Sequence, residues 1–213
     1  KPQLQPLPNS GVQPGNVVSA WLQRLVPAGC IVLAAFYVWG SLMTPWEFDV
    51  VEYHLQAPKE FYQDGIIAFN RHNVYSNMPL GAEMHTLAVM VLSGGQDGWW
   101  WGGLVGKTII GLHALLASAL LGGFIARRIG RWGGWAAASL LLAAPGNAHV
   151  SMAGLIDMVL ASYLLASLVV FTLVRQNLKN RVNIWAGVFL GSQLAGAAAA
   201  CKYTGLPFVL VPL

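Results

Sequence analysis

Residues 99–126 read WWWGGLVGKTIIGLHALLASALLGGFIA, an apolar run that only Lys107 and His113 interrupt. A helix needs about 20 apolar residues to cross the hydrocarbon core of a bilayer. This stretch is longer than that, so it predicts a membrane-spanning helix. The chain is therefore expected to be an integral membrane protein.

The composition of the whole chain agrees with this interpretation. Of 213 residues, 56% are hydrophobic and 9% are charged, whereas soluble domains carry about 25% charged residues. Nine Trp and twenty-four Gly are more typical of membrane helices than of a soluble core. The net charge of +4 is spread along the chain, so it does not indicate a nucleic-acid partner.

Further apolar stretches flank this run on both sides, at residues 26–46, 133–148, 155–174 and 184–201. A sixth begins at Gly205, and the sequence stops inside it at Leu213. We therefore expect an all-α, polytopic transmembrane bundle of about five or six membrane helices, and a piece of a longer protein. The expected domain is residues 20–213, incomplete at its C-terminus. Residues 1–19 form a disordered cytoplasmic tail, because their Pro, Gln, Gly and Asn cannot bury a core.

The charges predict the orientation of these helices. By the positive-inside rule, the basic residues that flank the membrane segments should face the cytoplasm. Before the first segment this is Arg24, and between later segments these are Arg127, Arg128, Arg131, Arg175, Lys179 and Arg181. The N-terminus is then cytoplasmic, and the outer loops are 47–98, 146–154 and the turn near Lys202. All eight acids fall in or beside these outer loops, namely Glu47, Asp49, Glu52, Glu60, Asp64, Glu83, Asp97 and Asp157.

The stretch from Leu80 to Leu92 is apolar but only about 13 residues long. That length favours an interfacial helix over a full span. We place it on the outer surface as a juxtamembrane helix, with Trp99, Trp100 and Trp101 anchoring the next helix at the interface.

Most of the candidate chemistry lies in loop 47–98. If residues 47–56 are helical, Asp49 and Glu52 share a face. Two close carboxylates can raise one another's pKa, bind a divalent cation or act as a general base. They can equally be ordinary surface acids, and the spacing alone does not separate these alternatives. His54, beside them, is the one histidine considered as a substrate or metal contact.

The membrane segments themselves carry few ionisable residues. Asp157 is the strongest single signal, since such a residue is costly in a membrane helix and usually functional or paired; it could also cap a helix start. Lys202 could hold an anionic group or extend to the interface. Lys107 requires a partner that the sequence does not name, and His113 is expected to be a hydrogen-bonded bundle residue. Cys30 and Cys201 are expected to be buried and unpaired.

The run DVVEYHL at residues 49–55, together with Pro58-Lys59 and Asn77-Met78-Pro79, resembles the N-terminal part of the GT-C class of polytopic glycosyltransferases. That class includes the protein O-mannosyltransferases and the bacterial aminoarabinose transferases that modify lipid A. The resemblance covers nearly all of residues 26–213 and rests on the order and spacing of several weak motifs.

The resemblance implies transfer of a sugar from a polyprenyl-phosphate carrier to an acceptor on the non-cytoplasmic face, in a bacterial inner membrane. Asp49 would be the general base and Asp157 would support the acceptor or a cation. Lys202 would stabilise the leaving phosphate. No metal ligand set is assigned, although Glu52 could help to bind a divalent cation. The expected substrate-binding residues are Glu52, His54, Lys59, Asn77, Glu83, Lys202 and Tyr203.

One motif departs from the pattern of the aminoarabinose transferases, which carry a Glu-Lys pair before the Pro-Leu helix. Here the matching residues are Ser76-Asn77-Met78-Pro79, so Lys59 or Arg71 would have to replace the phosphate-binding lysine. A second hypothesis is a non-catalytic accessory subunit of a larger membrane complex, because the Gly- and Ala-rich stretch 187–200 allows close helix packing. A transporter is disfavoured, since no inverted repeat is visible.

Overall fold

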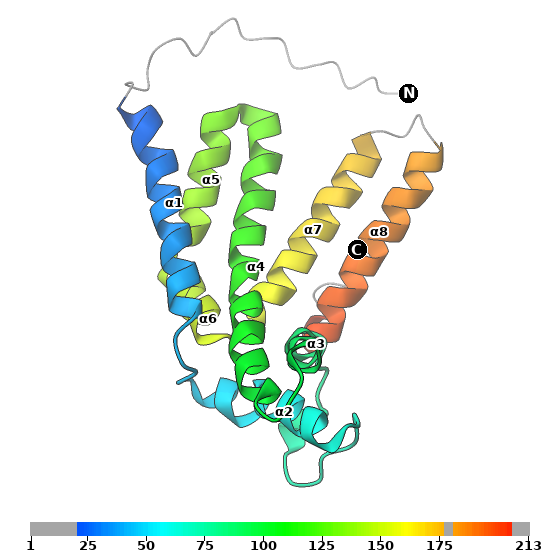
Figure 1. The fold of residues 1–213 in the computed structure, drawn as a ribbon. Helices are drawn as coiled ribbons and strands as arrows, with labels where there is room; N and C mark the ends of the chain where they lie inside the picture. Colours follow the sequence, from blue (N-terminus) through cyan, green and yellow to red (C-terminus); the bar gives the residue numbers. More distant parts are fainter. Residues whose placement is uncertain (1–20, 177–180, 206–213) are drawn as a thin grey trace, which may run out of the picture.

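A computed structural model describes residues 21–176 and 181–205 of the chain, and every regular element in these residues is helical (Figure 1). The long helices are α1 (Leu22–Ser41), α4 (Gly98–Ile129), α7 (Asp157–Gln176) and α8 (Arg181–Cys201). Shorter helices are η1 (Val50–His54), α2 (Gln56–Asp64), η2 (Val74–Asn77), α3 (Glu83–Ser93), α5 (Arg131–Ala143) and α6 (Pro145–Ala153).

The prediction of an all-α helical bundle is confirmed for the described residues. Four of their helices are long and apolar enough to cross a membrane, over Arg24–Ser41, Gly98–Ile129, Asp157–Gln176 and Ile184–Cys201. The expected total of five or six stays a prediction, because the sixth segment falls mostly on residues 206–213, outside the described part. The expected tail, residues 1–19, also lies outside it.

The predicted third membrane helix, residues 133–148, is divided in the structure. Helix α5 ends at Ala143 after 13 residues, and Pro145 begins α6 at a position where its missing N–H costs nothing. Ala144, directly before the proline, is extended, as steric contact with the proline ring favours. The segment predicted as an outer loop, 146–154, is mostly helical, since α6 covers 145–153; its position on the outer side stays a prediction. Together α5 and α6 return the chain beside α4 toward the other end of the bundle (Figure 1).

The end of α1 is held by a lysine of α4. The Lys107 ammonium is fully buried and donates hydrogen bonds to the carbonyl oxygens of Ser41 at 2.9 Å and Met43 at 3.0 Å. The last carbonyls of a helix have no partner within it and carry a partial negative charge. A cation is therefore stabilising at this place, and the partner that Lys107 requires is a helix end rather than an acid. Its alkyl stem lies against Gly154, at the turn between α6 and α7.

The short apolar helix α3 packs across the beginning of α4 and does not span the bundle. Contact between the two helices depends on glycines one turn apart in α4. A Cβ atom on Gly102 would lie 2.4 Å from Met90 Cα, and one on Gly106 would lie 2.6 Å from Thr86 Cα. Small residues of this kind allow the backbones of membrane helices to approach closely.

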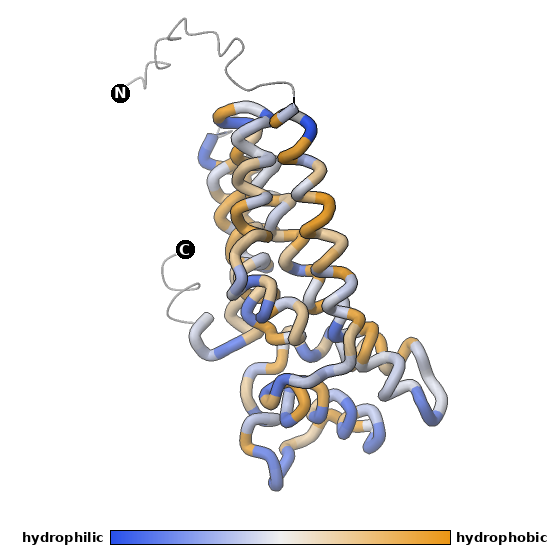
Figure 2. Tube along the Cα trace, turned by 90° about the vertical axis from the view of Figure 1, so that its left-hand side faces the viewer, coloured by the Kyte–Doolittle hydropathy of each residue, from blue (hydrophilic) through white to orange (hydrophobic). Residues whose placement is uncertain are grey.

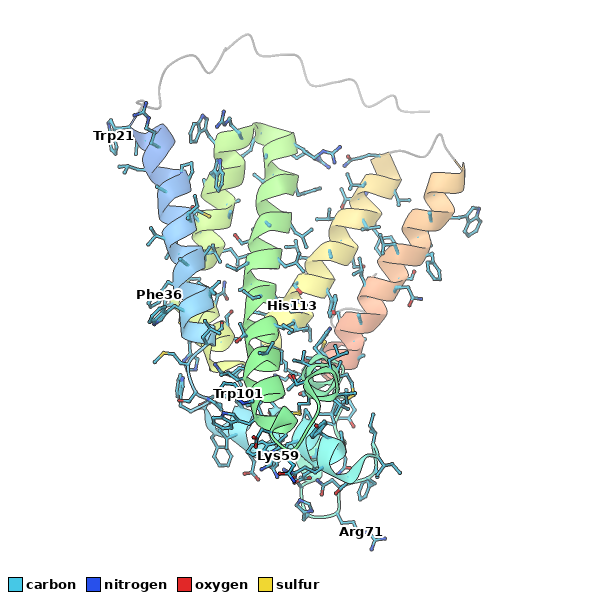
Figure 3. All side chains as sticks on the ribbon, viewed as in Figure 1. Trp21, Phe36, Lys59, Arg71, Trp101 and His113 are labelled. Atoms are coloured by element: carbon cyan, nitrogen blue, oxygen red, sulfur yellow. The ribbon has the colours of Figure 1, made fainter. Side chains whose placement is uncertain are left out.

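Polarity divides the molecule along its length. Hydrophobic residues dominate the middle of the bundle, and hydrophilic residues gather in the segment of 47–98 below it (Figure 2). Lys59 and Arg71 lie at that end, opposite Trp21, while His113 lies between them within the bundle (Figure 3). The arginines that begin α1 and end α4 are at the Trp21 end.

Replacing Gly106 by Ala should destabilise the fold, because its Cβ would meet backbone atoms of α3 that cannot move aside. Overpacking of this kind costs about 1–3 kcal/mol, so the midpoint of thermal unfolding in detergent should fall. Gly123→Ala on the same helix is the matched control, since nothing lies within 4 Å of its Cβ position. Equal midpoints for the two variants would contradict this packing.

Candidate functional site

Three segments that are distant in the sequence meet at the end of the bundle opposite the arginines. The Gly81 amide, before α3, donates to the Ala200 carbonyl of α8 at 2.9 Å. Ala82, Ile156 and Cys201 are buried in one apolar cluster. These contacts bring the start of α3, the start of α7 and the end of α8 together, and with them Glu83, Asp157 and Lys202.

Tyr53 of η1 shows that Asp49 and Asp157 belong to one electrostatic environment. Its pKa is raised to about 12, first by burial and then by the negative charges of Asp49 and Glu83, by a hydrogen bond to Asp49 and by the charge of Asp157. A negative charge opposes ionisation of a nearby phenol. The two predicted catalytic carboxylates therefore both act on the same phenol, which ties η1 to the start of α7.

His54 and Glu83 form a buried pair between η1 and α3. The His54 Nδ1–H group donates to Glu83 Oε1 at 2.5 Å, and the two side chains are 4% and 1% exposed. The second oxygen, Glu83 Oε2, has no partner among the described residues. Because these side chains are covered, the pair is placed to orient η1 and not to meet a substrate directly.

Asp157 and Lys202 form an ion pair at the open side of the group. Lys202 Nζ donates to Asp157 Oδ1 at 3.0 Å, and both side chains are about half exposed, at 46% and 49%. Tyr203, the next residue, is 58% exposed. An exposed pair of this kind contributes only about 0–1 kcal/mol to stability, so an incoming anion can displace the carboxylate from the lysine.

The remaining predicted substrate contacts lie elsewhere in the segment. The Lys59 ammonium lies 4.4 Å from the centre of the Trp99 ring, beside an apolar pocket of about 170 Å³. The side-chain amide of Asn77 forms its hydrogen bonds within the loop. It donates to the carbonyls of Asn70 and Asn73 and accepts from the Asn70 amide. Glu52 is exposed. Among the described residues, none of these three side chains forms a hydrogen bond or ion pair with Asp49, Asp157 or Lys202.

The helical prediction for residues 47–56 is only partly correct. Residues 50–54 form a turn of π-helix, closed by the Leu55 amide on the Val50 carbonyl. Such a turn is wider than an α-turn and is frequent at functional sites. Asp49 bonds to Tyr53, four positions later. Tyr53 was not predicted, although its spacing from Asp49 was a usable signal.

A second polar network, also not predicted, lies deeper between α3, α4 and α7. His85 Nδ1–H donates to the Ala82 carbonyl at 2.9 Å, which leaves Nε2 to accept from the Tyr163 hydroxyl at 3.0 Å. His113 Nδ1–H donates to Ser162 Oγ at 2.7 Å. The prediction that His113 is a hydrogen-bonded bundle residue is therefore confirmed. Cys30 and Cys201 are buried and free, also as predicted.

Across residues 21–176 and 181–205, no group of three or more His, Cys, Asp or Glu side chains is arranged to hold a metal ion. Within these residues Asp49 and Glu52 are therefore not joined by a third side chain of this kind. Comparison with protein-family models, with curated proteins and with solved structures found no match to this chain.

The Tyr53 phenol offers a direct test of this group. Asp49→Asn removes both a charge and a charged hydrogen-bond acceptor, so the Tyr53 pKa should fall from about 12 toward 10. Between those pH values the folded state retains a proton that the unfolded state loses, so stability declines as pH rises through this window. Because the variant lowers the Tyr53 pKa of the folded state, the pH range over which stability declines should become narrower. The ¹³C resonance of tyrosine Cζ reports the ionisation, and a Tyr53→Phe variant assigns it.

Asp64→Asn is the control for this titration, because Asp64 is an exposed carboxylate at the end of α2. It should leave the Tyr53 pKa unchanged. A Tyr53 pKa that is the same in wild type and Asp49→Asn would show that the two side chains do not interact.

Proposed function

We propose that this chain is the N-terminal membrane part of a GT-C-like glycosyltransferase. It transfers a sugar from a polyprenyl-phosphate carrier to a hydroxyl acceptor. The supporting observation is the grouping of Asp49, Tyr53 and the Asp157–Lys202 pair at one end of an apolar helical bundle. Such a site lies where a lipid-linked donor and a water-soluble acceptor can meet.

In this proposal Asp49 is the general base. The acceptor oxygen forms a bond to the anomeric carbon while the bond from that carbon to the phosphate oxygen breaks. The acceptor proton passes to Asp49, and the leaving polyprenyl phosphate takes the electron pair. A positioned base contributes about 10²–10⁴-fold to such a step. The Tyr53 hydroxyl holds the Asp49 carboxylate in place through their hydrogen bond.

Lys202 is the group that stabilises the leaving phosphate. Negative charge grows on the phosphate as the glycosidic bond breaks, and a fixed cation lowers that barrier. In the structure the ammonium donates to Asp157 at a half-exposed position. A carrier phosphate can therefore replace the carboxylate, which frees Asp157 to orient the acceptor hydroxyl. The buried His54–Glu83 pair keeps η1, and with it Asp49, in register with α3.

The distribution of charge supports a site on the non-cytoplasmic face. All eight acids of the sequence fall within residues 47–97 or at Asp157, at the end of the bundle that carries the candidate site. The arginines at the beginning of α1 and the end of α4 are at the other end. Under the positive-inside rule the arginine end faces the cytoplasm, as expected for an enzyme of a bacterial inner membrane.

A non-catalytic accessory subunit is the second candidate, and one observation favours it. Several apolar side chains of the outer segment are exposed, among them Ile66 at 61%, Ile67 at 63%, Phe69 at 77% and Val74 at 70%. Such an exposed apolar group is typical of a protein–protein contact. In that case the protein would purify with a larger complex, and Asp49 would be dispensable for its assembly.

The decisive experiment compares wild type with Asp49→Asn in membranes that contain the intact gene product and radiolabelled polyprenyl-phosphate sugars. Wild type should transfer label to an acceptor, and the variant should lose about 10²–10⁴-fold of that activity. Asp64→Asn makes the same chemical change on an exposed carboxylate of the same segment and should keep full activity. No transfer from any donor, with the protein held in a larger complex, would exclude the enzyme.

Lys202→Met tests the phosphate contact separately. The variant should lose about 10²-fold in turnover and also bind the donor more weakly. Its unfolding midpoint should stay close to that of wild type, since the ion pair is half exposed. Normal turnover in a stable Lys202→Met protein would place the carrier phosphate elsewhere, and Lys59 beside Trp99 would be the next candidate.

A further inference from the structure

An apolar pocket of about 410 Å³ lies between α1, α4 and α5, in the half of the bundle opposite the candidate site. Its walls are made largely of small residues, including Ala119, Gly122, Gly123, Gly134 and Ala138. Helices α4 and α5 approach closely where Gly122 meets Gly134. Beside this contact no large side chain fills the space, and nothing lies within 4 Å of the Cβ position of Gly123.

The pocket is open to the surroundings of the bundle along one side. Ile31, Ala119 and Gly123 line it and are exposed. Deep in the pocket, the Ser118 hydroxyl already donates to the Ala138 carbonyl at 3.1 Å. The lining between α1, α4 and α5 is otherwise largely apolar and suits a hydrocarbon chain.

The length of the pocket matches one leaflet of a bilayer. On α4 its lining runs from Leu115 to Ala126, which at 1.5 Å per residue is about 16 Å. Half of a hydrocarbon core is about 15 Å. A single acyl chain that lies along the helices of one leaflet would fill this depth.

Arg131 lines the end of the pocket, and Arg127 and Arg128 are in the last turn of α4 nearby. Within the described residues, Arg128 and Arg131 contact aromatic rings and not carboxylates. Arg131 lies 5.3 Å from the Trp132 ring and Arg128 lies 5.0 Å from the Phe124 ring. Stacking on a ring leaves the N–H edges of a guanidinium free, and those edges fit a phosphate.

A second copy of this chain, side by side and in the same orientation, would not complement these charges. All eight acids of the sequence are in residues 47–97 or at Asp157, toward the other end of the bundle. Such a copy would therefore place its own arginines beside these arginines, and like charges repel. An anionic lipid headgroup supplies the missing negative charge at the depth where the arginines lie.

We propose that this pocket binds one acyl chain of an anionic phospholipid, with the lipid phosphate on Arg131. The lipid belongs to the leaflet at the arginine end, so this site is separate from the proposed transfer site and does not depend on it. Apolar area buried along the chain gives affinity for any phospholipid. The arginines add the preference for negative charge.

Native mass spectrometry of the purified intact protein in detergent can test this, with dioleoyl phosphatidylglycerol and dioleoyl phosphatidylcholine as the two probes. The lipids carry identical chains, so they separate the charge from the hydrocarbon. Wild type should retain the phosphatidylglycerol more tightly. Arg131→Gln should reduce that advantage by about fivefold, the effect of one arginine near a lipid headgroup. Gly123→Leu should weaken binding of both lipids, because its side chain occupies the pocket.

Gly196→Leu on α8 is the control for Gly123→Leu, since nothing lies within 4 Å of its Cβ position either. It should bind both lipids as wild type does. Equal binding of the two lipids by wild type, or equal effects of the two leucine variants, would overturn the proposal. So would a dimer that Gly123→Leu disrupts, because a second copy would then occupy the pocket. Arg131 is exposed at a helix start, so Arg131→Gln remains informative if Gly123→Leu does not fold.

Discussion

The buried ammonium of Lys107 is the interaction on which the arrangement of the candidate site depends. It donates to the Ser41 carbonyl at the end of α1 and to the Met43 carbonyl just after it, and so fixes where the chain leaves the bundle toward Asp49. Its stem lies against Gly154, just before the turn that leads to Asp157. One side chain of α4 thus holds the approaches to both carboxylates. A buried cation without partners would be very costly, so this geometry is strongly specified.

The two ends of the bundle carry opposite charge, and the two proposals assign them different chemistry. At one end the charges of Asp49, Glu83 and Asp157 act on Tyr53, and Lys202 pairs with Asp157 at the open side. Arginines without carboxylate partners gather at the other end, beside an apolar pocket. The first arrangement suits proton transfer and a leaving phosphate. The second suits a lipid headgroup, which the arginines bind by electrostatic attraction without any catalytic step.

Much of the bundle could be predicted, because a bilayer imposes a minimum length on apolar helices. The runs at 99–126, 155–174 and 184–201 are helices within a few residues of their predicted limits. The short run at Leu80–Leu92 is a short helix packed on α4. Where the prediction was wrong, local backbone chemistry decided. Pro145 starts a new helix at 145–153, and hydropathy alone does not distinguish such a break from a loop.

The sequence by itself determined that this is a helical membrane protein with acids toward one end, because composition and run length are properties of the linear chain. It also indicated Asp49, Asp157 and Lys202. Only the tertiary structure decided which of these act together. Asp157 of α7 pairs with Lys202 after α8, and the charge of Asp49 acts on Tyr53. Lys59 instead contacts Trp99, and Asn77 forms hydrogen bonds within its own loop. Contacts of that kind depend on how helices pack through small residues such as Gly102 and Gly106, and the spacing of residues along the chain does not specify which helices will meet.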